Sequence, residues 1–166
     1  MIASRVLHNE VLGGSCGGVA ILRCEEGSIK DSNISSNSAL LGAGSSTNAI
    51  ADGGGMCVEL SNQVLIESTT FETNQAENRG GGLALLQASN ITVRLSTFLS
   101  NQATDGGSIS IGDSLFVNVS DVVLSNSSAT KNGGGLVVEA SNDVLIQRSR
   151  FFGSKTTTGF GSSIWY

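Results

Sequence analysis

The sequence lacks proline entirely and contains three cysteines, one histidine and few aromatic residues among 166 positions. High glycine without proline, and without a three-residue period, excludes a collagen-like chain. Three cysteines are too few for a disulfide framework, and an odd number leaves at least one thiol unpaired. The spacing of Cys16, Cys24 and Cys57 also matches no zinc-ligand pattern. We therefore interpret these cysteines as partly buried small residues at strand and turn positions.

Basic residues are also scarce, because nine lysines and arginines face fourteen acidic residues, for a net charge of −5. Without clustered positive charge, neither nucleic-acid binding nor a polybasic membrane anchor is expected. No run approaches the roughly 18 apolar residues that span a bilayer. The amino terminus lacks the apolar core of a signal peptide. Because the segment from Val6 to Asn9 already matches the repeat described next, we interpret the chain as a fragment of a longer solenoid.

One phrase recurs six times along the chain. It consists of an apolar residue, two variable residues, Asn, a variable residue, a small residue, and a glycine-rich run that ends in an apolar residue. The clearest copies start at Phe71 and Phe98. The apolar residues that close the glycine runs are Val19, Met56, Leu83, Ile109, Leu136 and Ile164. Successive residues of this set lie 26 to 28 positions apart, except that Val19 and Met56 are further apart. Residues 40–52, which are rich in Gly and Ser, account for the difference as a loop inserted between coils.

Each repeat contains three short apolar alternations with a period of two, which predict strands with one buried face. Three strands in each coil of about 27 residues predict a parallel β-helix, in which every strand pairs with its equivalent in the next coil. We therefore predict one all-β domain, residues 1–166, built as a solenoid of five to six coils. The third alternation begins at Ile34, Phe71, Phe98, Val123 and Phe151 in successive coils.

The recurring asparagines predict a structural ladder at one corner of the coil. Each amide would bond the next and satisfy the bent backbone, because Asn and Gly both tolerate left-handed backbone angles. The expected ladder residues are Asn9, Asn37, Asn74, Asn101 and Asn126.

The paired motif, Phe-x-x-Asn followed by Gly-Gly and an apolar residue, resembles the repeat of the chlamydial polymorphic outer membrane proteins. The resemblance extends from Val6 to Ile164 and implies a right-handed β-helix of the pectin-lyase-like superfamily. In that family the repeats form extracellular passenger segments implicated in adhesion. Some copies depart from the pattern, since Val6, Ile34 and Val123 replace Phe and Ser154 replaces Asn.

The alternative is a carbohydrate-active enzyme of the same fold, either a polysaccharide lyase or a glycoside hydrolase. Such chemistry requires acidic or basic residues clustered on adjacent coils. Glu59 and Glu139 are expected three coils apart, too far to act together, and Glu67 with Arg94 is expected to form a surface ion pair. We nominate no catalytic or metal-binding residue, and His8 is expected in solvent.

The sequence also contains four matches to the N-glycosylation pattern, at Asn33, Asn90, Asn118 and Asn126. Chance matches are expected in a chain rich in Asn and Ser, and a ladder position at Asn126 would make that match inaccessible. We predict a non-catalytic structural and adhesive module, or a spacer, of an extracellular or cell-surface protein. It would need no cofactor, could bind an extracellular protein or glycan, and could pair its end strands with neighbouring coils or chains.

Overall fold

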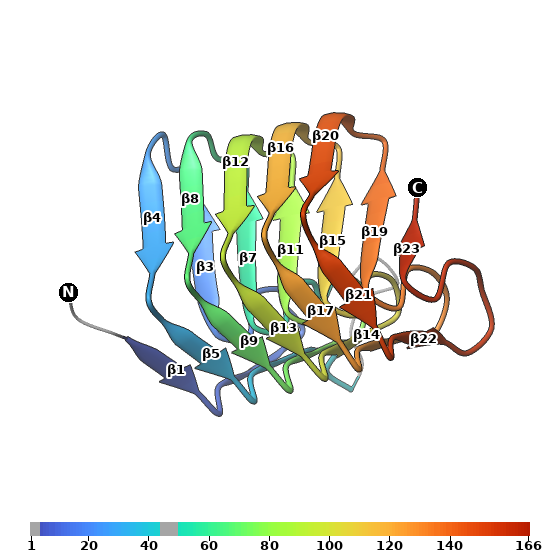
Figure 1. The fold of residues 1–166 in the computed structure, drawn as a ribbon. Coiled ribbons are helices and arrows are strands. Elements are labelled where there is room, and N and C mark those ends of the chain that lie inside the picture. Colours follow the sequence, from blue (N-terminus) through green and yellow to red (C-terminus); the bar gives the residue numbers. More distant parts are fainter. Residues whose placement is uncertain (1–3, 44–49) are drawn as a thin grey trace.

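A computed structural model describes residues 4–43 and 50–166 of the chain. Within these residues the protein has 23 short strands and no helix. The strands form four parallel sheets that run along the axis of a coiled solenoid, with one strand of each sheet in nearly every coil (Figure 1). The predicted parallel β-helix is thereby confirmed.

The four sheets are named in the order in which the chain reaches them. The first sheet contains β1 (Arg5–Leu7), β5 (Asn33–Ser35), β9 (Thr70–Glu72), β13 (Thr97–Leu99), β17 (Val123–Ser125) and β21 (Arg150–Phe152). The second sheet contains β2 (Glu10–Leu12), β6 (Ser38–Leu40), β10 (Gln75–Ala76), β14 (Gln102–Ala103), β18 (Ser128–Ala129) and β22 (Lys155–Thr156).

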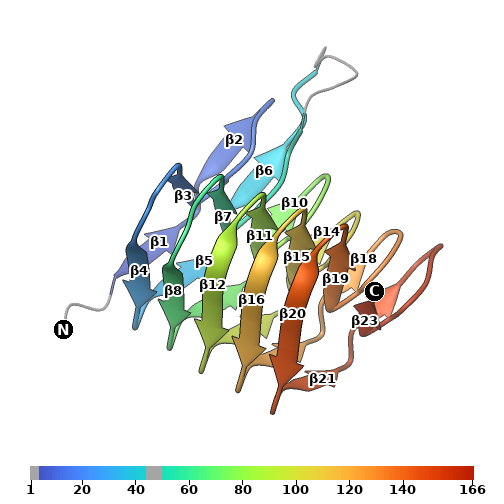
Figure 2. The same ribbon diagram turned by 90° about the horizontal axis from the view of Figure 1, so that it is seen from above.

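The third sheet contains β3 (Val19–Leu22), β7 (Met56–Glu59), β11 (Leu83–Leu86), β15 (Ile109–Gly112), β19 (Leu136–Glu139) and β23 (Ile164–Trp165). The fourth sheet contains β4 (Gly27–Lys30), β8 (Val64–Glu67), β12 (Ser89–Arg94), β16 (Leu115–Ser120) and β20 (Asn142–Gln147). Seen from above, the second sheet lies on the far side of the coil from the fourth (Figure 2).

The core is a set of stacked columns, because parallel pairing in register places equivalent side chains above one another. The Phe71 and Phe98 rings stack with centroids 4.6 Å apart and planes 1° from parallel. The next residue in this column is Leu124, which pairs with Phe98. The prediction of Val123 for this position was therefore wrong by one residue, and Val123 instead lies in the outward column below Thr97.

The corners between sheets are formed by residues with left-handed backbone angles, and many of these are not glycine. Ser36, Thr73 and Ser100 occupy one such corner with φ of 55°, 52° and 54°. The left-handed residue precedes the recurring Asn, so the Asn itself does not provide the bend as the sequence had suggested.

The glycine runs allow the backbones of successive coils to approach closely. A Cβ on Gly81 would lie only 2.4 Å from the carbonyl oxygens of Gln102 and Gly107, which no L side chain tolerates. Residues 40–52, the predicted inserted loop, follow from the end of β6 at Leu40. Residues 44–49 of that loop lie outside the described residues.

Candidate functional site

Asparagine side chains form a hydrogen-bonded ladder at the corner between the first and second sheets. The Nδ2 atoms of Asn9, Asn37 and Asn74 donate to the Oδ1 atom of the next ladder residue at 2.8, 3.1 and 3.0 Å, ending at Asn101. The backbone N–H of each donor residue donates to the same oxygen at 3.0 Å. Each buried amide also donates to a backbone carbonyl, as Asn101 does to Phe71 at 2.9 Å. These amides satisfy buried backbone groups, which is a structural role.

Asn126 is not part of the ladder, and this corrects the sequence prediction. The backbone N–H of Asn101 donates to the Ser127 Oγ atom at 3.2 Å, so Ser127 occupies the next ladder position. Asn126 precedes it, at the exposed left-handed corner with φ of 55°. The physical reason is the strand register, because pairing Leu124 with Phe98 places Ser127 three residues later on the ladder.

Hydroxyl groups play the same part at two further corners, which sequence reasoning missed. Between the third and fourth sheets, the Ser114 hydroxyl donates to the Gly112 carbonyl at 2.8 Å and accepts the Ala88 N–H at 3.2 Å. Between the fourth and first sheets, the Ser96 hydroxyl donates to the Arg94 carbonyl at 2.9 Å and accepts the Thr69 N–H at 3.1 Å. The recurrence of Ser or Thr at fixed distances from the glycine runs was the available signal.

Acidic side chains cap the turn that leads into the third sheet. The Asp52 Oδ1 atom accepts hydrogen bonds from the Arg79 backbone N–H at 3.0 Å and from Asn78 Nδ2 at 2.7 Å. Two coils further on, the Asp105 Oδ1 atom accepts from both the backbone N–H and the Nδ2 of Asn132 at 3.1 Å. The repetition of this arrangement indicates that the carboxylates hold the turn.

A groove of about 370 Å³ lies beside this turn, over the outer face of the third sheet. Leu86 is part of its apolar lining, and Asp52 and Arg79 line it together with carboxylates from neighbouring coils. The full lining is Ile50, Asp52, Glu59, Asn78, Arg79, Leu86, Gln87 and Asp113. The groove joins residues from turns, strand ends and corners, so comparison of single columns in the sequence did not reveal it. Its hydrogen-bonding groups could contact a polar ligand.

Asp52 is the one groove residue with a clearly altered acidity. Burial raises the pKa of its carboxyl group from the ordinary 3.8 to about 6, against the opposing effect of the nearby Arg79 charge and the hydrogen bonds from Arg79 and Asn78. The side chain is only 2% exposed to solvent. Near neutral pH the carboxylate is therefore mostly charged and serves as the acceptor that the turn requires.

Charged residues on the outer surface pair across coils. The predicted pair is confirmed, because Arg94 Nη2 lies 2.7 Å from Glu67 Oε1, and Lys30 Nζ lies 3.4 Å from the other Glu67 oxygen. Arg79 Nη2 lies 3.5 Å from Glu139 Oε2, so the groove arginine reaches a coil two steps away. Glu67 is thus paired with two cationic side chains and Glu139 with one.

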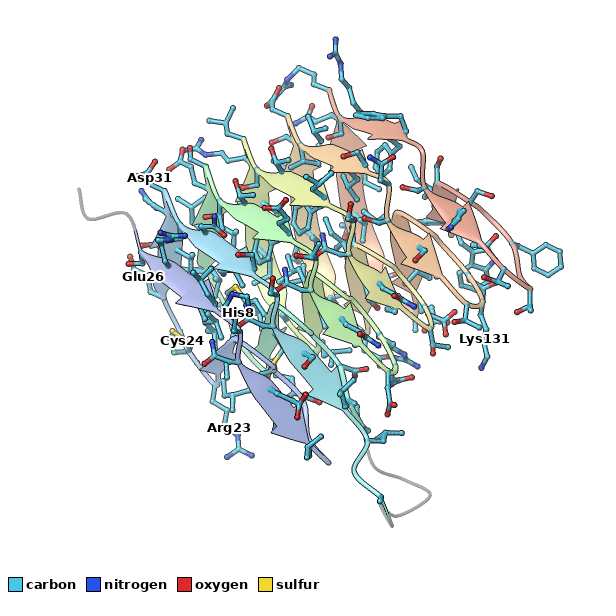
Figure 3. All side chains as sticks on the ribbon, turned by 90° about the horizontal axis from the view of Figure 1, so that it is seen from below. His8, Arg23, Cys24, Glu26, Asp31 and Lys131 are labelled. Carbon is cyan, nitrogen blue, oxygen red and sulfur yellow. A yellow bond between two sulfur atoms is a disulfide. The ribbon has the colours of Figure 1, made fainter. Side chains whose placement is uncertain are left out.

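Cys16 and Cys57 form a disulfide bond between adjacent coils, with Cα atoms 5.1 Å apart. The sequence interpretation of the cysteines as partly buried small residues at strand and turn positions did not include this bond. In-register stacking places Cys16, in the turn before the first glycine run, beside Cys57 in strand β7 of the next coil. The spacing of the cysteines along the sequence does not reveal this proximity. Cys24 is a free thiol at another corner, where its Sγ atom donates to the Glu26 carbonyl at 3.1 Å (Figure 3).

Other chemical groups do not gather into a recognised site. Across residues 4–43 and 50–166, His, Cys, Asp and Glu side chains form no group able to hold a metal ion. His8 is exposed at the corner after β1 (Figure 3). In the part of the chain that the structure describes, no helix is long and apolar enough to cross a membrane.

Comparison with known proteins agrees with this architecture. A family model described as a right-handed β-helix region matches residues 3–151. A solved structure from Parabacteroides merdae, provisionally described as a glycosyl hydrolase, is similar with a TM-score of 0.49 and 14% sequence identity. The superposition covers 87% of this chain and 72% of the Parabacteroides chain. No curated protein matches the sequence significantly. Because the family model spans most of the chain, the protein belongs to the right-handed β-helix family.

Proposed function

We propose that this β-helix is a non-catalytic structural and adhesive module of a secreted or cell-surface protein, with repeats of the polymorphic outer membrane protein type. The observation that carries the proposal is the use of its polar groups. Asparagine amides, serine hydroxyls and turn carboxylates bind the backbone of an adjacent coil. Asn101 Oδ1 accepts the backbone N–H of Asn74, and Asp52 Oδ1 accepts the backbone N–H of Arg79. Residues engaged in this way are suited to holding a rigid surface.

The turn carboxylates favour a scaffold over an enzyme. Asp52 has the raised pKa expected of a general acid, but Asp105 repeats its hydrogen-bonding arrangement. A catalytic acid is needed at one place, whereas a carboxylate that accepts the backbone N–H of a turn is useful in every coil that has this turn. The raised pKa follows from the burial that the turn imposes.

The disulfide supports an extracellular setting. Disulfide bonds persist in oxidising compartments and are rare in the cytosol, where thiols are kept reduced. Cys16 and Cys57 link the first two coils covalently, which suits a module exposed to the conditions outside a cell.

The groove beside Asp52 and Arg79 is the binding face that we assign to the module, with an extracellular protein or a glycan as the partner. It combines an apolar contact at Leu86 with carboxylate, amide and guanidinium groups, which together can hydrogen-bond hydroxyl, amide or amine groups. Asp113 stands on its rim at an exposed corner.

The test combines binding with a search for cleavage. The folded protein is applied to an array of glycans and extracellular proteins, and is also incubated with acidic and neutral polysaccharides in the presence of calcium. We expect at least one ligand whose binding falls tenfold or more in Asp113→Asn. Asp143→Asn is the matched control, since Asp143 is also an exposed left-handed corner residue but lies outside the groove.

The second candidate function is a carbohydrate-active enzyme, and one observation favours it. The groove holds Asp52, whose pKa is raised to about 6, together with Glu59 and Asp113. New reducing ends or unsaturated sugars that are lost in Asp52→Asn, in a variant shown to be folded, would establish this function and overturn the scaffold proposal. A folded protein that neither binds nor cleaves any member of these panels would contradict the adhesive role.

A further inference from the structure

The four matches to the N-glycosylation pattern fall into two structural classes. Asn33 in β5 and Asn118 in β16 are half-buried, and their Oδ1 atoms are buried without a hydrogen-bond partner. Asn90 and Asn126 are exposed, and each lies at a left-handed corner with φ of 55°. The exposure of Asn90 and Asn126 to solvent therefore distinguishes these two sites from Asn33 and Asn118.

We propose that Asn90 and Asn126 carry N-linked glycans, an inference that rests on the secreted setting proposed above. The Nδ2 atom attacks the anomeric carbon of a sugar held on a lipid diphosphate. A nitrogen–carbon bond forms, the carbon–oxygen bond to the diphosphate breaks, and the lipid diphosphate leaves with the electron pair. The amide nitrogen loses one of its two protons, which ends on the released diphosphate, so the exchange balances without an oxidant or reductant.

The repeat itself does not account for the motif residues at Asn126. The equivalent corner residues of the preceding coils are Ser36, Thr73 and Ser100, so this left-handed corner does not require Asn. The hydroxyl residue of the motif, Ser128, pairs in register with Gln102 on one side and Lys155 on the other, although Ser38 occupies the same column three coils earlier. The two immediately neighbouring coils therefore have neither Asn at the corner nor a hydroxyl residue two positions later.

The same argument applies to Asn90. The motif residue Thr92 pairs in register with Leu65 on one side and Asn118 on the other, and the corner residue of the previous coil is Gln63. The column again leaves both motif positions free to vary. Coil packing therefore does not require the complete motif, although Asn90 itself bonds Asn62 of the adjacent coil.

The local geometry leaves room for a sugar at Asn90 and for the side-chain amide at Asn126. Asn90 Nδ2 donates one hydrogen to Asn62 Oδ1 at 2.8 Å, and glycosylation replaces only the other hydrogen, so this bond is retained. An open groove of about 340 Å³ on the fourth sheet begins beside Asn90 and includes Leu65, on which the apolar face of a first sugar can pack. At Asn126 the Oδ1 atom lies over Gly153, whose missing side chain leaves it room, since a Cβ there would be 2.3 Å away.

The test is secretion of the chain from cultured eukaryotic cells behind a host export signal. Purified protein is treated with peptide N-glycosidase in heavy-oxygen water, which converts each glycosylated Asn to a mass-labelled Asp that peptide mass spectrometry locates. We expect label at Asn90 and Asn126, at least fivefold above that at Asn33 and Asn118. Thr92→Ala and Ser128→Ala should each remove one glycan, whereas Ser128→Thr should retain it.

Absence of label at Asn90 and Asn126 in secreted, folded protein would overturn the inference, and so would equal labelling at Asn33 and Asn118. Because the added signal imposes export, an unmodified chain counts against these sites and not against the proposed location. Conversely, failure of the array and cleavage assays would refute the adhesive function and leave the glycan sites standing.

Discussion

Replacement of Asn101 by Leu tests the corner ladder directly. The substitution removes the Oδ1 atom that accepts from the Asn74 backbone N–H and Nδ2, each at 3.0 Å, and the Nδ2 atom that donates to Phe71 O at 2.9 Å. Three buried groups each lose a hydrogen bond, although Asn74 Nδ2 keeps its bond to the Ile34 carbonyl at 2.8 Å. At about 1–3 kcal/mol for each lost bond, the free energy of unfolding should fall by about 3 kcal/mol or more. Relative to a typical total of about 5–15 kcal/mol, this is a large loss.

The assay is reversible urea or thermal unfolding followed by far-UV circular dichroism. For a chain of this size, a loss of about 3 kcal/mol lowers the Tm by about 6–12 °C. The control is Asn126→Gly, which alters an exposed corner residue outside the ladder to the residue that the last coil has at Gly153. We expect the control to change the free energy by less than about 1 kcal/mol. Equal losses in the two variants, or no loss in Asn101→Leu, would refute the ladder as a source of stability.

Three further predictions concern other parts of the coil. Reduction of the Cys16–Cys57 disulfide, which closes a separation of 41 residues, should lower stability by about 4 kcal/mol in the chain-entropy description, and melts with and without reductant measure this. The pKa of Asp52 is about 6 in the folded protein against an ordinary 3.8, so between about pH 4 and 6 the folded state keeps a proton that the unfolded chain has released. The free energy of unfolding should therefore fall as the pH rises from about 4 to 6 and stay level above it. Urea titrations of Asp52→Asn should lack this slope. Gly81→Ala should prevent folding or lower the free energy of unfolding by about 3 kcal/mol or more, since its Cβ would meet carbonyl oxygens at 2.4 Å. The control Gly112→Ala should fold normally, because its nearest contact is a flexible side chain at 3.3 Å. Similar melting curves for the two variants would contradict the close contact between coils.

The periodic pattern of the sequence was sufficient to predict the parallel β-helix, because in-register stacking places like residues at like positions in every coil. The fifth copy shows where pattern matching fails. Val123 and Asn126 fit the phrase in letters, but the strand pairing selects Leu124 and Ser127. Consecutive apolar residues blur the period of two there, and a serine hydroxyl can replace the amide as acceptor.

The groove and the disulfide could not be predicted from single columns of the repeat. Asp52 comes from a turn, Glu59 from a strand end and Asp113 from a corner, so their proximity depends on how the coil bends. Cys16 and Cys57 likewise occupy different positions of the repeat and meet only because adjacent coils stack. Proximity between unlike positions requires the three-dimensional path of the chain.

The hydrogen bonds between coils also determine how the module would respond to mechanical load. Equivalent residues of successive coils are about one repeat apart, as Asn74 and Asn101 are at 27 residues. A pull that peels the chain from one end breaks the rungs of a single coil before it reaches the next. At about 3.4 Å per extended residue, each step releases about 90 Å of contour length. A β-helix at a cell surface would thus lengthen in discrete steps under tension, and its disulfide would keep Cys16 and Cys57 joined so that the segment between them could not extend.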